Sequence, residues 1–593
     1  MKFCFDFINN TFVYSKSILK SKLNYIFTFA MLLLSIGHVS SNGLKNTDIS
    51  SLILYILLAY FLSGRIPDTV LPEKQKVKLL FVFSAVFTVI IMVGVNYNFR
   101  HRDLWGGLLR TAAAVPGVFL IVRFLFIKVC YYANILRIKL LADTSLKTNV
   151  KAVRRVSFFL VFIPCIIVWA NMYPGTYSGD APSQINQAVN LTGFENMNPF
   201  INTLIIIPCI QIGMYVKDIG TGIAIYLFLI AILYSLVWSY VCGLLYKAGF
   251  RRGIIIATIL FADYPINLIY VVSMYKDTFY AICFLLSLAY VYSLTKAQYV
   301  RKKDLIIVVL LSLVTSLARN SGWSALLILA LFLFICARKN GRSFLYKISI
   351  ALCCGAFSAF MVMGFIYPIF NISTIQSYVS ISVQLQQIAR VAKENNYTDI
   401  EKCEIIKFGK EADMMHSLSK DYDERLVDPI RSDFDLYYIS EHKKDFNKMW
   451  FTLGTKHLKE FAYAYIDHTC CLWWPDAVSW ITDSRIFEND YGIERKPLLF
   501  PQYDIAGNLY YDILARLPII PYLNNSGITF WLVLVCLYLC LMRDNILGAA
   551  FCAAMLTVYV GLLIFAYSPL FRYTYSVVLS MPLLLLFMEL QTD

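Results

Sequence analysis

Residues 169–203 read WANMYPGTYSGDAPSQINQAVNLTGFENMNPFINT, and they interrupt a chain that is otherwise dominated by long apolar runs. The stretch follows the apolar run Ser157–Val168 and turns at Pro174-Gly175 and again at Ser178-Gly179. Glycine and proline at such positions are typical of tight turns. Two turns directly after a membrane-type run predict that Asp180 lies just beyond the membrane edge, where an ionised carboxylate stays solvated.

The composition of the 593 residues excludes a soluble globular protein, because 59% are hydrophobic, 16% are aromatic and only 15% are charged. A net charge of +15 is also found in nucleic-acid-binding proteins. Here, however, the lysines and arginines cluster between hydrophobic runs, a pattern typical of topology signals and of contacts with anionic lipids. We therefore predict an all-α polytopic membrane protein whose partner is the lipid bilayer and not nucleic acid.

Hydrophobic runs predict about fourteen transmembrane helices, each ideally about 20 residues long. They lie near residues 23–39, 51–64, 77–96, 109–132, 156–172, 221–245, 254–274, 277–295, 305–318, 322–337, 347–370, 526–542, 546–566 and 573–589. The apolar run Phe200–Gly213 is shorter and contains Pro208, so we expect a juxtamembrane or re-entrant helix there. This choice places the basic loops Lys247–Arg252, Arg301–Asp304 and Arg338–Lys347 on the cytoplasmic side, together with both termini.

The same reading divides the chain into four parts. Residues 1–155 form the N-terminal transmembrane helices, and residues 156–371 form a transmembrane core with an outer loop at 173–200. Residues 372–525 hold most of the acidic side chains, so we expect a mainly helical extracytoplasmic segment. Residues 526–593 form the C-terminal transmembrane helices.

Asp180 has two interpretations from its local sequence. An aspartate at the outer membrane surface can act as a general base. An aspartate directly before Ala181-Pro182 can also cap the helix that begins there, because aspartate is a favoured N-cap and proline is favoured in the first turn. The sequence alone leaves both interpretations open.

The motif YPGTYSGDAPSQINQ, followed by NPFINTLIIIPCIQIG, resembles the first outward loop of the GT-C superfamily of membrane glycosyltransferases. That superfamily includes protein mannosyltransferases and the lipid A aminoarabinose transferases, and it places in this loop an acidic residue that deprotonates the acceptor. Asp180 is the matching position. The chain resembles more closely still an uncharacterised family of bacterial multi-span membrane proteins, through Lys276-Asp277, Arg319-Asn320, Gln384–Arg390 and Phe571-Arg572-Tyr573.

The resemblance to the GT-C superfamily implies transfer of a sugar from a polyprenyl-phosphate-linked donor to an extracytoplasmic envelope glycan, lipid or protein. Such a transfer needs a base for the acceptor hydroxyl and positive charge for the departing phosphate. We expect Asp180 to be the base, and arginine and lysine side chains to bind the phosphate. The alternative for each cation is a membrane-boundary anchor. The residues expected to bind substrate are Lys276, Asp277, Arg319, Asn320, Arg572, Tyr173, Gln184 and Asn198.

Two other functions fit a chain of this kind: a transporter or flippase of lipid-linked glycans, and a non-catalytic scaffold for envelope assembly. No cofactor is expected, because the chain has neither a Walker lysine motif nor a Rossmann glycine fingerprint. No metal site is expected either, since its histidines lack ligand spacing and most of its cysteines fall in apolar runs. The sequence leaves open whether the reaction needs a divalent metal.

Overall fold

The computed structural model describes residues 76–98, 104–140, 149–297, 299–373, 381–411, 413–475, 477, 485–516, 525–565 and 570–589, and the expected spans at 23–39 and 51–64 lie outside these ranges. The described residues form helices joined by turns, with isolated β-bridges and no strand among them. Eight described helices are long and apolar enough to cross a membrane, or nine if one bent pair is a single span. The protein is therefore a multi-pass, all-α membrane protein.

The chain divides into two compact units, Met1–Leu140 and Leu141–Asp593. In the first unit, α4 (Val77–Asn98) packs against α5 (Leu104–Leu140) through edge-to-face aromatic pairs, including Phe81 with Phe119 and Phe87 with Phe126. Both helices contain a candidate span. The expected spans at 77–96 and 109–132 are thus helical where they were predicted.

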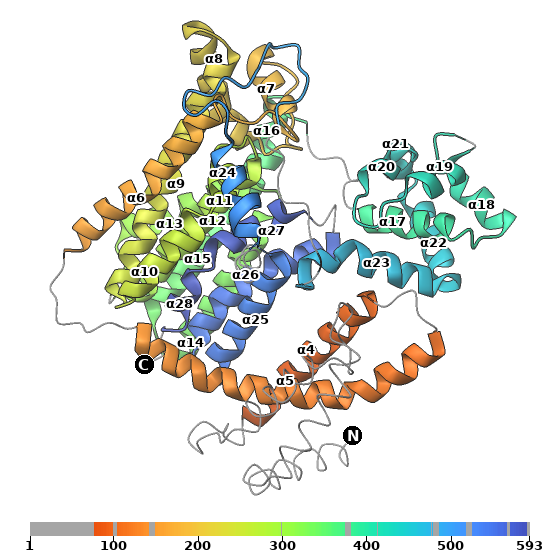
Figure 1. Cartoon of the computed structure of the whole chain (residues 1–593), viewed down its shortest axis with the longest axis horizontal. Helices are drawn as coiled ribbons and strands as arrows, with labels where there is room; N and C mark the ends of the chain where they lie inside the picture. Colours follow the sequence, from red (N-terminus) through yellow and green to blue (C-terminus); the bar gives the residue numbers. More distant parts are fainter. Residues whose placement is uncertain are drawn as a thin grey trace, which may run out of the picture. The chain divides into compact units, whose positions relative to one another are not determined.

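The second unit contains the remaining described spans (Figure 1). Its candidate spans are α6 (Val150–Asn171), α9 (Ile219–Lys247), α12 (Lys276–Thr295), α14 (Gly322–Asn340), α15 (Ser343–Met361) and α26 (Ile546–Phe565). Two further apolar helices, α13 (Lys302–Ala318) and α25 (Ser526–Met542), have 17 residues each. The apolar stretch of α15 continues through η4 (Val362–Ile366) and α16 (Tyr367–Ile369). Helix α12 is the most enclosed of the candidate spans and packs against α9, α13 and α27 (Phe571–Ser580). Its first residue therefore lies where several helices meet.

The expectation of one continuous helix at 254–274 is wrong. The chain forms α10 (Arg251–Ala257), η3 (Thr258–Ala262) and α11 (Pro265–Val271), with a bend of 61° between the two arms. The break falls directly before Pro265, which lacks a backbone N–H and pushes Tyr264 into an extended conformation.

The expected span at 573–589 is also interrupted. Helix α27 ends at Ser580, and α28 (Leu583–Phe587) begins after Met581-Pro582. A proline inside a helix removes one backbone donor and clashes with the preceding turn, which explains why the helix is divided at this point.

Two shorter helices follow α6, as the sequence predicts: α7 (Ala181–Asn190) and α8 (Phe200–Val216). Helix α8 has 17 residues and contains Pro208, so it is short for a span of about 20 residues. It packs on α9 and α7. Its amide and hydroxyl side chains near the N-terminus are buried against α7 and α9, where Asn202 accepts a hydrogen bond from Tyr226.

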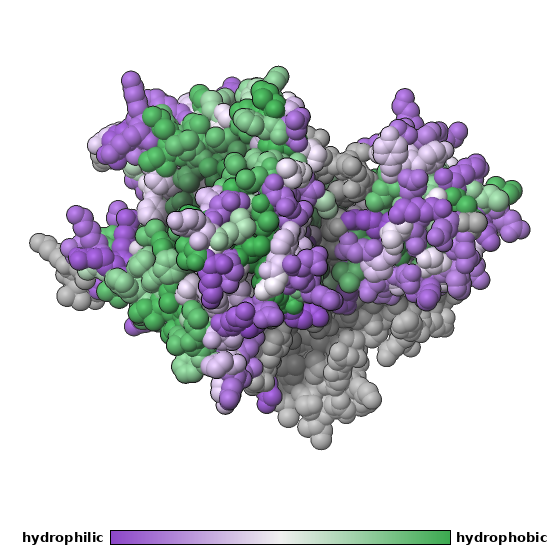
Figure 2. Space-filling view, turned by 90° about the horizontal axis from the view of Figure 1, so that it is seen from above, coloured by the Kyte–Doolittle hydropathy of each residue, from purple (hydrophilic) through white to green (hydrophobic). Residues whose placement is uncertain are grey.

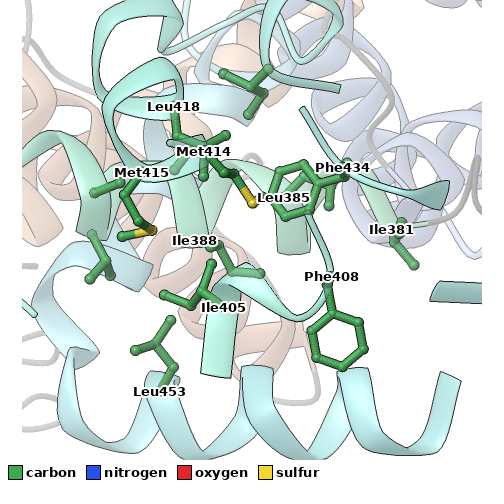
Figure 3. Close-up of a cluster of buried hydrophobic side chains, with 14 of the residues drawn as sticks. Ile381, Leu385, Ile388, Ile405, Phe408, Met414, Met415, Leu418, Phe434 and Leu453 are labelled. Carbon is green, nitrogen blue, oxygen red and sulfur yellow. The ribbon is translucent and has the colours of Figure 1, made fainter. Parts of the chain in front are cut away.

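Residues 381–473 form a further set of helices, here called the helical module, whose last helix also packs on α25 and α26. It contains α17 (Ser382–Lys393), α18 (Asp399–Ile406), α19 (Met414–Asp421), α20 (Asp428–Arg431), α21 (Leu436–Glu441), α22 (Lys443–Lys456) and α23 (Leu458–Trp473). Aliphatic, methionine and phenylalanine side chains from these helices converge in one core (Figure 3). The face of this module that is visible in Figure 2 is mostly hydrophilic.

The Gln384–Arg390 motif lies inside the helical module. The Gln386 amide donates to the carbonyls of Asp423 and Leu426, and Arg390 pairs with the buried carboxylate of Asp467 at 3.3 Å. These contacts tie α17 to its neighbouring helices. The motif therefore organises the module.

A segment after the helical module returns to the loop at residues 173–200. Residues 485–504, here called the strap, precede α24 (Ile505–Asn508), η6 (Leu509–Ile513) and η7 (Leu514–Arg516). Figure 1 shows the blue trace of this segment passing beside α7 and α8. The Tyr491 hydroxyl donates to Asn186 of α7 at 2.7 Å, so the strap lies directly against this loop.

Candidate functional site

The loop between α6 and α7 is shaped by two glycines. Gly175 has φ of 125°, and a Cβ at this position would lie 2.1 Å from the side chain of Leu227. Gly179 has φ of 59°, and a Cβ there would lie 3.6 Å from the Arg572 guanidinium. Residues other than glycine rarely adopt these φ values. Glycine at both turns therefore lets the backbone beside Asp180 approach Arg572 closely.

The strap holds the other edge of this loop. The backbone N–H of Phe487 donates to the Tyr177 carbonyl at 2.8 Å, and the N–H of Lys496 donates to the Tyr173 carbonyl at 2.9 Å. At the end of α6, the Asn171 amide donates to backbone carbonyls of the strap at distances of 2.6 to 3.1 Å. The loop that carries Asp180 is thus fixed from two sides.

Asp180 occupies the N-cap position of α7 but does not act as a cap, because its side chain makes no capping hydrogen bond. Instead, its Oδ2 atom accepts a hydrogen bond from Arg572 Nη1 at 3.0 Å and lies 3.3 Å from Lys276 Nζ. The two cations come from the first turns of α27 and α12. The capping interpretation is therefore wrong for the side chain of Asp180.

A second carboxylate, that of Asp277, lies close to Arg319 and Arg572. Asp277 is 3% exposed; its Oδ1 is 3.5 Å from Arg319 Nη1, and its Oδ2 is 4.0 Å from Arg572 Nε. The last two atoms, Asp277 Oδ2 and Arg572 Nε, have no hydrogen-bond partner among the described residues. Arg319 and Arg572 therefore lie close together, since both contact Asp277.

Tyrosine rings surround the two guanidinium groups. Arg319 lies over the rings of Tyr280 and Tyr573, at 5.4 and 5.3 Å from their centroids. Arg572 lies over Tyr275 and Tyr573 at 5.8 and 5.0 Å, and Arg319 also donates to the Tyr573 carbonyl at 2.8 Å. Such cation–π contacts and hydrogen bonds hold both guanidinium groups in fixed orientations.

Two asparagines complete the arrangement. Asn198 accepts a hydrogen bond from Lys276 Nζ at 2.7 Å. Asn320 accepts one from the Asn196 amide at 3.2 Å, and it donates to the Asn196 carbonyl at 3.3 Å. Asn198 therefore orients the lysine, whereas Asn320 links the end of α13 to the turn before α8.

The site carries three cations, Lys276, Arg319 and Arg572, against two carboxylates, Asp180 and Asp277. Burial of Asp180 acts to raise its pKa, but the charges of Lys276 and Arg572 and their hydrogen bonds outweigh this and lower the pKa below its ordinary value. The free site thus holds an ionised Asp180 and an excess of positive charge, which is suited to an anionic ligand.

Comparison with protein families gives one match, over residues 187–591, to a family described as being of unknown function, DUF6020. The chain belongs to the DUF6020 family. No protein of curated function and no solved structure matches it. The DUF6020 match includes Lys276, Asp277, Arg319 and Arg572, whereas Asp180 lies seven residues before its start.

The structure brings six of the nine predicted site residues together through ion pairs and hydrogen bonds. They are Asp180, Lys276, Asp277, Arg319, Arg572 and Asn198, here called the charged cluster. Asn320 directly follows Arg319 in the chain and bonds to Asn196. Gln184 is fully buried between α7 and α8, where it donates to Thr203 at 3.3 Å. The Tyr173 hydroxyl is 3.3 Å from Thr221 Oγ1. We therefore assign Gln184 and Tyr173 to packing.

Sequence reasoning missed Tyr275, Tyr280 and Asn196. Tyr275 directly precedes the Lys276-Asp277 pair, and Tyr280 lies in the next turn of α12. A single aromatic residue beside a charged pair is common at membrane boundaries and carries no specific signal. Contact with guanidinium groups from α13 and α27 is visible only in the folded DUF6020 chain.

Proposed function

We propose that this protein is an integral membrane glycosyltransferase that moves a sugar from a polyprenyl-phosphate carrier to an extracytoplasmic acceptor. The proposal rests on one observation above all: Asp180 lies between Lys276 and Arg572, beside a second pair formed by Asp277 and Arg319. A carboxylate next to several cations, at the outer end of apolar helices, supplies both the base and the phosphate-binding groups that this transfer needs.

In the proposed reaction, the Asp180 carboxylate accepts the proton of the acceptor hydroxyl, and the hydroxyl oxygen bonds to the anomeric carbon of the donor sugar. The bond between that carbon and the phosphate oxygen breaks, and its electron pair stays with the departing polyprenyl phosphate. Arg319 and Arg572 bind the phosphate oxygens, because guanidinium groups make paired hydrogen bonds to them.

Binding of the donor would also raise the proton affinity of the Asp180 carboxylate. In the free site, Lys276 and Arg572 both contact its Oδ2 atom and stabilise the ionised carboxylate. A bound phosphate would compete for the same two cations, and each cation that turns to the phosphate leaves Asp180 with greater affinity for a proton. Proton transfer to Asp180 is therefore favoured when the donor is in place.

The topology that accompanies this proposal has about fourteen spans in a bacterial cell membrane, with both termini cytoplasmic. The outer loop and residues 372–525 then face outward. Cys403 is exposed on the helical module and provides a native probe. A membrane-impermeant maleimide should label it in intact cells, and Cys403→Ser should remove that label. A Ser343→Cys probe should react only after permeabilisation, and its labelling in intact cells would invert the topology.

The activity is tested with purified protein and a panel of polyprenyl-phosphate sugars. The expected result is release of polyprenyl phosphate that depends on an acceptor and that falls in Arg572→Gln and Arg319→Gln. Lys217→Gln serves as the matched control, because Lys217 is an exposed cation on the loop between α8 and α9. Equal rates in all three variants would remove the arginines from the phosphate site.

A transporter of lipid-linked glycans is the second candidate, and the bent pair α10–α11 favours it. Broken helices at membrane depth are typical of transporter binding sites, and the pair bends by 61° at Asp263 and Tyr264. The two functions differ in their product, because a transporter moves the lipid-linked sugar without breaking its bond to phosphate. Translocation of intact donor into liposomes, without release of polyprenyl phosphate, would favour the transporter.

A further inference from the structure

Three cysteines from two neighbouring helices meet in the interior of the second unit. Cys536 and Cys540 lie one turn apart on α25, and Cys552 lies on α26. All three side chains are buried, and their sulfur atoms all lie within 4.8 Å of one another. Among the described residues, no other three histidine, cysteine, aspartate or glutamate side chains gather in this way.

The surroundings of these thiols come from a third helix and from the turn between the first two. The Cys536 and Cys540 sulfurs lie 3.9 and 4.0 Å from the carbonyls of Leu584 and Phe587, at α28. The buried amide of Asn545 donates to Phe587 at 2.8 Å and lies 4.0 Å from Cys540 Sγ. An amide N–H directed at a ligand sulfur supports negative charge on that sulfur.

A glycine makes the close approach of the two helices possible. A Cβ at Gly548 of α26 would lie 2.8 Å from Cys540 Sγ and 2.3 Å from the Phe587 carbonyl oxygen. Any larger residue at this position would push α26 away from α25. The three thiols therefore converge because the backbone at Gly548 leaves room for the Cys540 side chain.

The sulfur atoms, all within 4.8 Å of one another, are close enough to bind one three-coordinate metal ion. With metal–sulfur bonds of about 2.3 Å, the three ligand sulfurs around a trigonal ion lie about 4 Å apart. Thiolate ligands favour soft cations such as copper(I) and zinc. Structural zinc sites almost always have four ligands, whereas the cluster supplies three. We propose that Cys536, Cys540 and Cys552 form a copper(I) site that joins α25 to α26.

The alternative is that the three cysteines act only as small apolar side chains, as isolated buried cysteines do. Cys165, Cys242 and Cys283 are buried in the same unit and belong to no such group among the described residues. They are therefore a matched control for the three clustered cysteines. A general affinity of buried thiols for copper would affect both sets equally.

The test uses the full chain in lipid nanodiscs, kept anaerobic, and titrated with copper(I) against a chromophoric copper(I) chelator. Wild type should bind one more equivalent than a variant with Cys536→Ala, Cys540→Ala and Cys552→Ala. The control variant with Cys165→Ala, Cys242→Ala and Cys283→Ala should keep that equivalent. Copper should also raise the melting temperature of wild type and of the control, but not that of the cluster variant.

The single variant Cys552→Ala addresses the case in which the triple variant fails to fold, because it removes one sulfur and leaves α25 unchanged. We expect at least a tenfold loss of copper(I) affinity, and X-ray absorption of the wild-type complex should show sulfur ligands only. Unchanged affinity in Cys552→Ala would overturn the proposal. Binding of zinc in place of copper(I), in a parallel titration, would overturn the choice of ion.

Discussion

Helix α6 of the transmembrane core and the helical module are built in opposite ways. On α6, several apolar side chains are exposed, and Val156, Phe159 and Ile163 are each more than half exposed. In the module, Leu385, Ile388 and Phe434 are fully buried, while the face visible in Figure 2 is mostly hydrophilic. Both regions are helical, so the difference lies in the solvent that each one faces.

The contrast explains how each region is held together. Burial of apolar surface away from water stabilises the module. In the core, the lipid is as apolar as the side chains, so packing and hydrogen bonds between helices provide specificity. The buried hydroxyls of Ser287 on α12 and Thr315 on α13 lie 2.9 Å apart and are one example. Buried uncharged polar side chains are thus ordinary in the core. A buried cluster of charged side chains such as that around Asp180 is unusual there.

The largest expected effect concerns Asp180, the carboxylate that we propose as the base. Asp180→Asn should lower the rate of sugar transfer by about 10²–10⁴-fold, because the amide cannot accept the proton. The melting temperature should fall as well, because asparagine leaves Lys276 and Arg572 without the carboxylate that both contact. Release of polyprenyl phosphate is the measurement.

Asp218→Asn is the control for that variant. Asp218 caps α9, where its carboxylate accepts from the Thr221 N–H at 2.7 Å, and asparagine caps about as well. Its rate should match wild type. If Asp180→Asn turned over normally in a folded protein, this carboxylate would not be the base.

Two further variants compare the loss of a buried apolar side chain in the module with the loss of an exposed one in the core. Leu385→Ala removes a fully buried side chain and should destabilise the module by about 2–5 kcal/mol. Leu160→Ala, on the exposed face of α6, should change stability by about 0.5 kcal/mol or less. Hydrogen exchange of the module amides measures the first change, and thermal unfolding measures the second. A larger loss from Leu160→Ala would show that this face of α6 packs against protein.

The reverse experiment places charge on each exposed surface. Phe159→Lys puts an ammonium near the middle of α6 and should disfavour membrane insertion by about 2.5–3.5 kcal/mol. Ile400→Lys, at a position of the module that is 76% exposed, should be tolerated. Membrane-inserted yield, compared between the two variants, is the measurement. Equal yields would contradict the conclusion that α6 faces lipid and the module faces water.

The smallest expected effect is on pH dependence. Since its folded pKa is lowered, Asp180 stays ionised above that value, and its ion pairs are lost only as pH falls through it. The kcat/KM for donor should therefore vary by less than about twofold between pH 5 and 7 through this group. Lys276→Gln removes one of the two cations that lower the pKa, so its acid limb should move to higher pH. A wild-type acid limb near neutrality that Asp180→Asn abolished would contradict the lowered pKa.

Much of the membrane architecture follows from the order of residues alone. A run of about 20 apolar residues predicts a helix, because lipid leaves backbone groups no partner but each other. Helices α6, α9, α12, α25 and α26 lie where their apolar runs predicted them. The interruptions before Pro265 and at Pro582 were visible as prolines. Hydrophobicity alone does not predict their consequence, because it takes no account of the backbone donor that proline lacks.

The sequence also determined which charged residues stood out, since Asp180, Lys276-Asp277, Arg319 and Arg572 each border an apolar run. It could not determine their contacts, because residues separated by up to 392 positions meet only after α12, α13 and α27 pack together. Only the tertiary structure decided that Asp180 pairs with cations and does not cap its helix. The same holds for the cysteines of α25 and α26, because a side chain's partners across helices depend on the rotation and approach of each helix, which local sequence does not specify.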